Sequence, residues 1–292
     1  MEELRLENVI DLIPERRADS HKGTFGSLLC VCGSGSYRGA AALACEAALR
    51  CGTGIVRLAS TEKVCAAVAA RIPEVTFLPQ EEGKNGEICG FSAGQIFESF
   101  PGITAALCGC GITVSSSTRS MVFDLIKNAP CTLVLDADAL NCIKSIPDVL
   151  RGAKKTPVIT PHWGEFARLC GITVEEVARE PERLAADTAR ENGCVVALKS
   201  HFTVIASPDG GVCVSRLGNA GLARGGSGDL LAGMIASFAA EGLSAYDSAR
   251  LGCALHGAAA DRCAGRLGMT GMLPHDVIAD LIEIFKEREI QK

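Results

Sequence analysis

The chain has 292 residues, of which 48% are hydrophobic, and its formal net charge at pH 7 is -5. This length and apolar content suffice for a large buried core, and the scattered charges argue against a nucleic-acid-binding surface. No apolar run approaches the roughly 20 residues that span a membrane, and the first twenty residues lack the pattern of a secretory signal, so we expect a soluble protein.

The 15 cysteines raise the question of disulfides. Most of them lie inside apolar runs, where a reduced thiol behaves as a small hydrophobe, so we expect a reducing, cytoplasmic location. The pairs Cys30/Cys32 and Cys108/Cys110 are each expected to present both sulfurs on one face of a strand. A metal site built from both pairs is the alternative, but core packing is favoured because no His or Cys-x-x-Cys motif accompanies them.

Apolar periodicity and turn residues predict an alternation of strands and helices after an N-terminal arm that is helical over Val9 to Arg17 at most. Strands are expected at 27–32, 55–59, 75–78, 105–108, 132–136, 157–160, 194–198, 203–207 and 212–216. Helices are expected at 38–51, 62–70, 94–100, 115–128, 138–143, 164–170, 181–191, 229–241, 245–266 and 275–286. The polar segment 80–90 is predicted to be a surface connection.

This alternation predicts an α/β fold in one domain over residues 1–292, with a mostly parallel central sheet flanked by helices on both faces. The strands at 203–207 and 212–216 read as a hairpin that forms an antiparallel edge. In such sheets ligands bind beyond the carboxyl ends of the strands. Unusual polar strings follow the expected strands repeatedly, at 33–39, 109–111, 136–138, 160–165 and 199–203, and a glycine loop at 225–228 completes the set.

The glycine loop reads Gly225-Gly226-Ser227-Gly228 and precedes Asp229 and an apolar helix. Small residues allow a tight bend that aims backbone N–H groups at one point, and the helix start adds positive dipole density, so the loop predicts an anion site. Asp229 is expected to be ionised near neutrality and is a candidate general base. The alternative is an ordinary loop in which Ser227 caps a buried helix.

Two better-known phosphate motifs are excluded. Ser227 stands where a P-loop would have lysine, and Arg38 stands where a dinucleotide fingerprint would have its third glycine.

Other polar residues near the strand ends leave alternatives open. Asp136 and Asp138 could hold a cation or a ribose, or Asp138 could only cap the next helix. His162 and Glu165 have the spacing of one helix face, and for this pair we favour a hydrogen-bonding role over a metal site. Lys199 could reach a phosphate or be a solvated strand end.

Three further residues have ordinary structural alternatives. Asn219 could only form a turn, and Arg224 could clamp a phosphate or be a solvated loop charge. His256, in the middle of an expected helix, is interpreted as a packing residue.

Taken together, these strings resemble the ADP-dependent NAD(P)H-hydrate dehydratases of the ribokinase-like superfamily, over nearly the whole chain. The matching strings are His21-Lys22-Gly23 through Gly54 with Gly33-Ser34, Tyr37 and Gly39-Ala40-Ala41, then Leu135-Asp136-Ala137-Asp138-Ala139-Leu140-Asn141, Thr160-Pro161-His162-x-Gly164-Glu165, Lys199-Ser200-x-x-Thr203 and Gly225-Gly226-Ser227-Gly228-Asp229. The resemblance implies a ribokinase-like fold and a repair activity. A nucleoside diphosphate, or ATP in many eukaryotic members, would phosphorylate the ring hydroxyl of (6S)-NAD(P)H hydrate, and elimination of phosphate would restore NAD(P)H, with AMP and phosphate as the other products of ADP.

The resemblance also implies site residues. Ala40, Gly111, His162 and Asn141 would contact the hydrated dinucleotide, and Asp229 would face its hydroxyl. The adenine nucleotide would be held by Lys199, Ser200, His201, Phe202, Thr203, Gly226 and Gly228. Mg²⁺ is expected to accompany the nucleotide, and no side chain is assigned to it as a metal ligand.

Further expectations concern partners. We expect a homo-oligomer, and a homotetramer is one such assembly. We also expect a separate epimerase protein that is functionally linked through the hydrate. The alternative functions are a ribokinase-like kinase of a small alcohol or vitamin precursor, and a nucleotide-sensing module without turnover.

Overall fold

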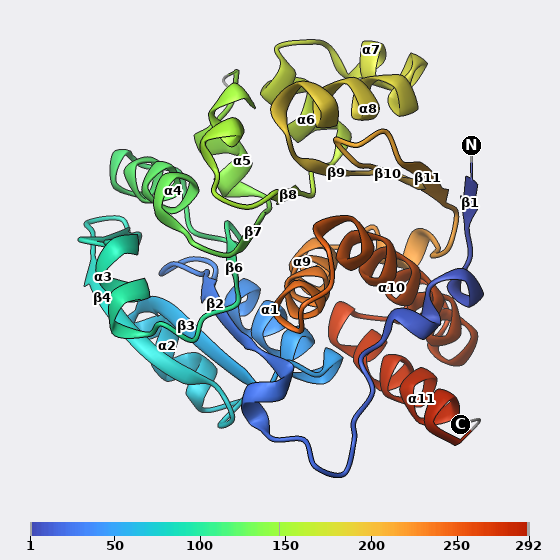
Figure 1. The fold of residues 1–292 in the computed structure, drawn as a ribbon, viewed down its shortest axis with the longest axis horizontal. Coiled ribbons are helices and arrows are strands. Elements are labelled where there is room, and N and C mark those ends of the chain that lie inside the picture. The colour runs from blue at the N-terminus through green and yellow to red at the C-terminus, as the bar shows by residue number, and fades with distance from the viewer. Residues whose placement is uncertain (1, 146, 291–292) are drawn as a thin grey trace.

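The computed structural model describes residues 2–145 and 147–290. They form an 11-stranded sheet with the order β1-β11-β10-β9-β8-β7-β6-β2-β3-β4-β5 (Figure 1). The strands are β1 Glu2–Leu4, β2 Ser27–Val31, β3 Ile55–Thr61, β4 Thr76–Glu82, β5 Ile88–Cys89, β6 Ala105–Cys108, β7 Thr132–Leu135, β8 Val158–Ile159, β9 Val195–Lys199, β10 Thr203–Ala206 and β11 Val212–Ser215. All neighbours from β9 across to β4 are parallel, so the predicted mostly parallel sheet is confirmed.

Helices cover both faces of the sheet, as predicted. The α-helices are α1 Arg38–Cys51, α2 Glu62–Ala69, α3 Ala93–Ser99, α4 Ser116–Asn128, α5 Asp138–Cys142, α6 Trp163–Cys170, α7 Val174–Arg179, α8 Pro181–Asn192, α9 Ser227–Ala240, α10 Ala245–Leu267 and α11 Val277–Ile290. The 3₁₀ helices are η1 Leu6–Asn8, η2 Ile10–Leu12, η3 Lys22–Phe25, η4 Pro147–Gly152, η5 Ala220–Leu222 and η6 Pro274–Asp276. Buried residues of α1, α2, α9, α10 and α11 share one apolar core, and those of α3 to α8 share the other. Figure 1 shows α9 and α10 inside the curve of the sheet and α4 to α8 along its outer side.

Strand β2 shows why the parallel strands have continuous apolar sequences. All five of its residues are buried. Leu28 and Cys30 pack into the core that contains α1 and α9, whereas Leu29 and Val31 pack into the other core. A strand covered by helices on both faces needs apolar side chains at every position, which removes the usual alternation.

Helix α9 is held against α1 by small residues. A Cβ atom at Gly233 would lie 2.3 Å from the carbonyl oxygen of Ala44, so only glycine allows this close approach. The hydroxyl of Ser237 is 3.0 Å from the carbonyl oxygen of Ala48, and 2.7 Å from the hydroxyl of Thr53. These contacts fix the position of α9, whose N-terminus belongs to the candidate site described below.

The predicted N-terminal helix is wrong. The arm instead contributes β1, which pairs in parallel with β11, followed by the short 3₁₀ helices η1 and η2. Leu4 and Val9 are buried in the core, so the apolar residues of this arm serve tertiary packing, which overrides local helix preference. The hairpin of β10 and β11 is confirmed, but β11 is not the edge strand, because β1 lies beyond it.

Three smaller differences from the predicted elements are also found. The segment 80–90 is not only a connection: β4 extends to Glu82 and pairs with β5. Helix α7 was not predicted. The expectation that Cys108 and Cys110 share one face is also wrong, since Cys108 packs in the core with α4 and Cys110 in the core with α9. The chain turns between them at Gly109, which has a φ of 128°.

Among the described residues, no helix combines the length and the apolar character that crossing a membrane requires.

Candidate active site

The sheet reverses its winding between β2 and β6. The chain proceeds from β2 to β3 on one side, and from β6 to β7 on the other. The loops that follow these two strands meet at this point, where the Gly33 amide donates to the carbonyl oxygen of Cys110 at 2.8 Å and the hydroxyls of Ser34 and Thr113 are 2.9 Å apart. Ligands of open α/β sheets bind at such switch points.

Ala40 and Gly111, two predicted substrate residues, lie together at this switch point. A Cβ atom at Gly111 would be 3.0 Å from that of Ala40 and 2.5 Å from that of Tyr37. The start of α1 and the loop after β6 therefore form one wall. Asn141 lies elsewhere, on α5, where its Oδ1 accepts a hydrogen bond from Arg168 at 3.0 Å.

The carboxyl ends of the next three strands, β7, β8 and β9, meet at Asp136. This buried carboxylate follows β7, and its Oδ1 accepts hydrogen bonds from the Thr160 hydroxyl at 2.7 Å and from the Lys199 ammonium at 2.8 Å. Lys199 is the last residue of β9 and its side chain is 18% exposed, so the alternative of a solvated strand end is wrong. Burial lowers the pKa of Lys199, but the charges of Asp136 and Glu165 outweigh it and raise the pKa above its ordinary value. The site therefore keeps a buried cation.

Asp138 does not cap a helix. Ala137 occupies the position before α5, with a φ of 49°, and Asp138 is the first residue of the helix. Its Oδ2 accepts a hydrogen bond from the Thr113 amide at 2.9 Å. Asp138 therefore ties the loop after β6 to the end of β7.

The glycine loop places the N-terminus of α9 over the buried ion pair. A Cβ atom at Gly228 would lie 3.5 Å from Nζ of Lys199 and 3.7 Å from Oδ2 of Asp136. The N-cap position belongs to Gly226, with a φ of 101°, so the alternative in which Ser227 caps the helix is wrong. The Ser227 hydroxyl is buried and has no hydrogen-bond partner among the described residues. Free amides at a helix start beside a lysine form an anion site.

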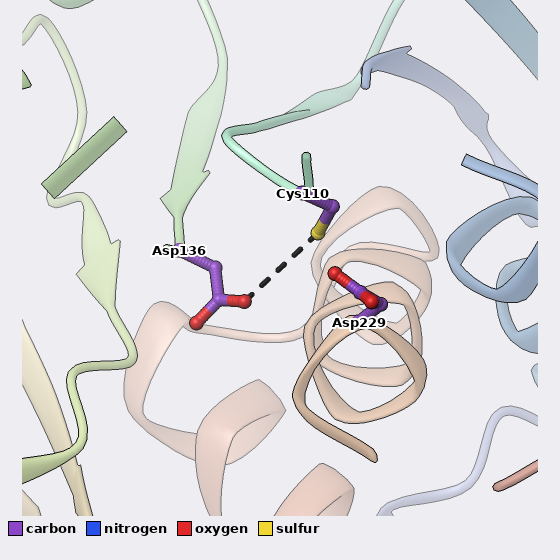
Figure 2. Close-up of side chains that lie close together, drawn as sticks. All are labelled: Cys110, Asp136 and Asp229. Carbon is purple, nitrogen blue, oxygen red and sulfur yellow. Dashed lines mark hydrogen bonds between the residues drawn. The ribbon is translucent and has the colours of Figure 1, made fainter. Parts of the chain in front are cut away.

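Asp229 points toward the same region from the first turn of α9. Figure 2 shows its carboxylate with Asp136 and Cys110, whose donor atoms all lie within 4.8 Å of one another. Burial raises the pKa of Asp229 to about 7, and the charge of Asp136 adds to this effect. At pH 7 about half of this carboxyl is therefore ionised, rather than nearly all of it as expected, because desolvation outweighs the effect of the helix start. A pKa close to the working pH suits a general base.

A cavity of about 660 Å³ opens beside the anion site. It is lined by His162, Lys199, Ser200, His201, Phe202, Thr203, Leu217, Gly218, Asn219, Ala220, Leu222, Ala223, Arg224, Ser227, Gly228, Leu231, Cys253, His256 and Gly257. It therefore unites every predicted nucleotide residue except Gly226. His162, which was predicted to contact the dinucleotide, lines this cavity too, and its Nδ1 accepts hydrogen bonds from the amides of Gly164 and Glu165.

The loop before α9 forms the outer wall of the cavity. Asn219 makes the predicted turn, since its Oδ1 accepts from the Gly221 amide at 2.9 Å, and its Nδ2 also donates to Asp261. Arg224 is held by the carbonyl oxygen of Thr270. Sequence reasoning assigned no site role to His256, because a histidine within a helical run of small residues has the pattern of a packing residue.

The donor set of Cys110, Asp136 and Asp229 partly suits a divalent cation. Mg²⁺ prefers oxygen ligands and often binds through one or two carboxylates together with substrate phosphates, so the two aspartates fit and the thiol does not. The alternative metal site from the Cys30/Cys32 and Cys108/Cys110 pairs is not among the clusters found in residues 2–145 and 147–290.

Comparison with known proteins identifies the family. The family model described as NAD(P)H-hydrate dehydratase matches residues 28–283. The chain belongs to this family. One relative of this NAD(P)H-hydrate dehydratase family member is an ADP-dependent (S)-NAD(P)H-hydrate dehydratase of Xanthomonas campestris. The two sequences are 38% identical over a match that covers 86% of this chain and 85% of the relative. A bifunctional NAD(P)H-hydrate repair enzyme of Moorella thermoacetica is 36% identical over 95% of this chain, which spans 52% of that relative's length.

Solved structures agree with the family assignment. The ADP/ATP-dependent NAD(P)H-hydrate dehydratase of Bacillus subtilis, co-crystallised with ATP and Mg²⁺, matches with a TM-score of 0.83, 30% identity and 98% coverage of both chains. A ribokinase-like superfamily protein of Enterococcus faecalis matches with a TM-score of 0.80 at 24% identity, covering 98% of this chain and 96% of its own. The predicted ribokinase-like fold of this NAD(P)H-hydrate dehydratase family member is therefore confirmed.

Proposed function

We propose that the chain dehydrates (6S)-NAD(P)H hydrate to NAD(P)H at the expense of ADP, with release of AMP and phosphate. The observation that carries this proposal is the position of Asp229, which lies in the first turn of α9 within 4.8 Å of Asp136 and next to the anion site. The names of the relatives from Xanthomonas campestris and Bacillus subtilis support it.

Asp229 is the proposed base. It accepts the proton of the ring hydroxyl while the hydroxyl oxygen attacks the terminal phosphorus of ADP, and AMP leaves. The ring nitrogen then pushes out the phosphate, and a neighbouring ring carbon loses a proton to form the double bond. The elements of water removed from the hydrate thereby end in AMP and phosphate. The buried Lys199 and the amides of the glycine loop offset the negative charge on the transferred group.

The cavity is the proposed nucleotide site. The residues Lys199, Ser200, His201, Phe202, Thr203 and Gly228 all line it, and its volume of about 660 Å³ lies in the usual range for small-molecule sites. Gly226 does not line the cavity, and it is proposed to take part in the nucleotide site as the N-cap residue of α9. Mg²⁺ is proposed to bind mainly through the nucleotide phosphates, with the carboxylate of Asp136 as the residue that would help to hold it, and it would neutralise phosphate charge. The relative from Bacillus subtilis was crystallised with ATP and Mg²⁺, which supports this proposal.

The hydrated dinucleotide is proposed to occupy the switch point, on the side of Ala40 and Gly111. His162 lines the nucleotide cavity, so its proposed contact with the dinucleotide requires the two ligands to meet at its ring. Asn141 is proposed to border the outer part of the dinucleotide site from α5. We also propose a cytoplasmic location, a single domain over residues 1–292, a homo-oligomer such as a tetramer, and a functional link to an epimerase. The bifunctional repair enzyme among the relatives supports a link to a second repair activity.

Product analysis tests this proposal. After incubation with chemically hydrated NADH, Mg²⁺ and ADP, we expect NADH, AMP and phosphate in equal amounts. A stable phosphate ester in place of NADH would instead identify the kinase of a small alcohol, and binding of ADP without any product would identify the nucleotide sensor.

A further inference from the structure

Thr113 has an unfavourable backbone conformation in the loop after β6, which forms one wall of the proposed dinucleotide site. Its φ is 64°, in the left-handed region, where a β-branched residue is an outlier. Gly109 and Gly111 of the same loop also have positive φ angles, of 128° and 66°, but glycine adopts such angles without steric cost. A strained residue persists only where its surroundings fix it, so Thr113 depends on the contacts that hold it.

Three elements hold Thr113, one at each of its polar groups. Its amide donates to Oδ2 of Asp138, the first residue of α5, at 2.9 Å. Its carbonyl oxygen accepts from the hydroxyl of Thr118 on α4 at 2.7 Å, and its own hydroxyl is 2.9 Å from that of Ser34 in the loop after β2. Ser34 and Thr118 are buried, so the packing around them keeps these two partners in place. We call these three contacts the Thr113 clamp.

The clamp controls the position of Gly111, two residues earlier in the chain. A Cβ atom at Gly111 would lie 2.5 Å from that of Tyr37 and 3.0 Å from that of Ala40, so the loop packs closely against the start of α1. Ile112, between Gly111 and Thr113, is fully buried and passes a shift of one to the other. Among the described residues that line the nucleotide cavity, none comes from the loop 109–114. A change in the clamp should therefore affect binding of the dinucleotide and leave binding of ADP unchanged.

We infer that the Thr113 clamp, through the carboxylate of Asp138, holds the loop 109–114 in the conformation that binds the hydrated dinucleotide. Asp138 is then a positioning residue for this substrate, which acts through the Thr113 amide and not on the reacting atoms. Without the carboxylate, the strain at Thr113 drives the loop toward a relaxed conformation. This inference rests on the proposed function and adds to it a residue that controls affinity for one of the two substrates.

Two measurements on Asp138→Ala test this inference. With saturating ADP and Mg²⁺, we expect kcat/KM for hydrated NADH to fall by at least about tenfold, because a lost charged hydrogen bond displaces the wall of the site. Calorimetric titration should give the wild-type affinity for ADP. Asp138→Asn keeps a carbonyl oxygen that can accept from the Thr113 amide, so it should restore most of kcat/KM. In a Thr113→Gly background, where the loop is not strained, Asp138→Ala should cost clearly less.

Asp124→Ala is the matched control. Oδ2 of Asp124 on α4 accepts from the Ala93 amide at the start of α3 at 2.7 Å, so it is also a carboxylate that holds the backbone of another element. Its loss should leave kcat/KM for hydrated NADH at the wild-type value. Hydrogen exchange adds a readout that needs no substrate, because the amides of residues 109–114 should exchange faster in Asp138→Ala than in the wild type.

Wild-type kcat/KM in a folded Asp138→Ala protein would overturn the inference. So would a joint loss of hydrate turnover and ADP affinity, or an equal cost of Asp138→Ala in the Thr113→Gly background. If Asp138→Ala does not fold, Thr113→Val decides, since it keeps the side-chain shape but loses the contact with Ser34, and unchanged kcat/KM would contradict the clamp. A wild-type protein that forms no NADH from the hydrate is a different result, which would overturn the proposed function. Hydrogen exchange would then still test the clamp, and an unchanged rate over residues 109–114 would refute it.

Discussion

The ammonium of Lys199 lies 2.8 Å from Oδ1 of Asp136, although 63 positions separate the two residues in the sequence. Lys199 ends β9 and Asp136 follows β7, while Thr160, which also donates to Asp136, follows the intervening strand β8. The ion pair and the Thr160 hydrogen bond together join the carboxyl ends of three neighbouring strands beside the start of α9. The candidate active site and the stability of the sheet depend on the same contact.

Breaking this ion pair from one side should destabilise the protein strongly. Lys199→Met and Asp136→Asn each remove one member of the pair and leave the other as an uncompensated buried charge. Each change should lower the free energy of unfolding by about 3 kcal/mol. The double variant should lose clearly less than the sum, because it leaves neither charge unpaired. Urea denaturation of the four proteins measures this coupling. Additive losses would show that the two residues do not interact.

Asp229→Asn should abolish turnover and retain nucleotide binding. The amide keeps the shape of the side chain but cannot accept the hydroxyl proton, so we expect a loss of at least about 100-fold in kcat. The affinity for ADP should change little, because the phosphates are proposed to contact Lys199 and the loop amides. Asp209→Asn, an exposed change in the turn between β10 and β11, is the matched control. Wild-type turnover in Asp229→Asn would contradict the assignment of the base.

The rate should depend on pH through Asp229. Burial raises the pKa of this carboxyl to about 7, and only its ionised form can act as a base. We therefore expect kcat to fall by about tenfold per pH unit well below pH 7 and to level off above it. A rate that is constant between pH 5.5 and pH 8 would contradict this prediction.

The same pKa shift predicts how stability changes with pH. The folded pKa of about 7 exceeds the ordinary value of 3.8, so between these values the folded state binds more protons than the unfolded state. The contribution of Asp229 to stability is therefore present at low pH and is lost as pH rises through 7. Glu241 has the same direction of shift, so the wild type contains both effects. In melting experiments, Asp229→Asn should gain a few degrees relative to the wild type at pH 8 and less at pH 5.5. An equal difference at both pH values would contradict the shift.

Gly233→Ala should destabilise the protein by disturbing the contact between α9 and α1. The added Cβ would lie 2.3 Å from the carbonyl oxygen of Ala44, so the helices must move apart. We expect a loss of about 1–3 kcal/mol and reduced activity, since α9 carries Asp229. Gly94→Ala is the matched control within α3, where an added Cβ meets nothing within 4 Å and should be neutral or stabilising. Equal effects of the two changes on the melting temperature would be inconsistent with this packing.

Local sequence patterns predicted most of the fold. The bounds of α1 and β6 match the expected ranges, because each has a strong apolar pattern and clear flanking glycines or turns. The strand β1 could not be predicted in this way, since its pairing with β11 joins segments that are far apart in the sequence. Leu4 and Val9 look like helix residues locally, and only tertiary contact decides otherwise.

The candidate site was predicted in its parts but not in its geometry. Sequence position placed Asp136, Lys199 and Asp229 at strand ends and a helix start, where ligands of such sheets bind. Their mutual contacts depend on strand order, which brings β7 and β9 to either side of β8. The raised pKa of Asp229 depends on burial, and the cavity position of His256 depends on how α10 packs, neither of which a local pattern contains.

The most direct test of the proposed function is absorbance in the reduced-nicotinamide band. Purified protein is incubated with chemically hydrated NADH and Mg²⁺, with ADP, with ATP and without nucleotide. We predict a rise in absorbance that requires ADP and is absent in Asp229→Asn. No rise with either nucleotide, from a folded protein that binds ADP, would contradict the assignment as a dehydratase.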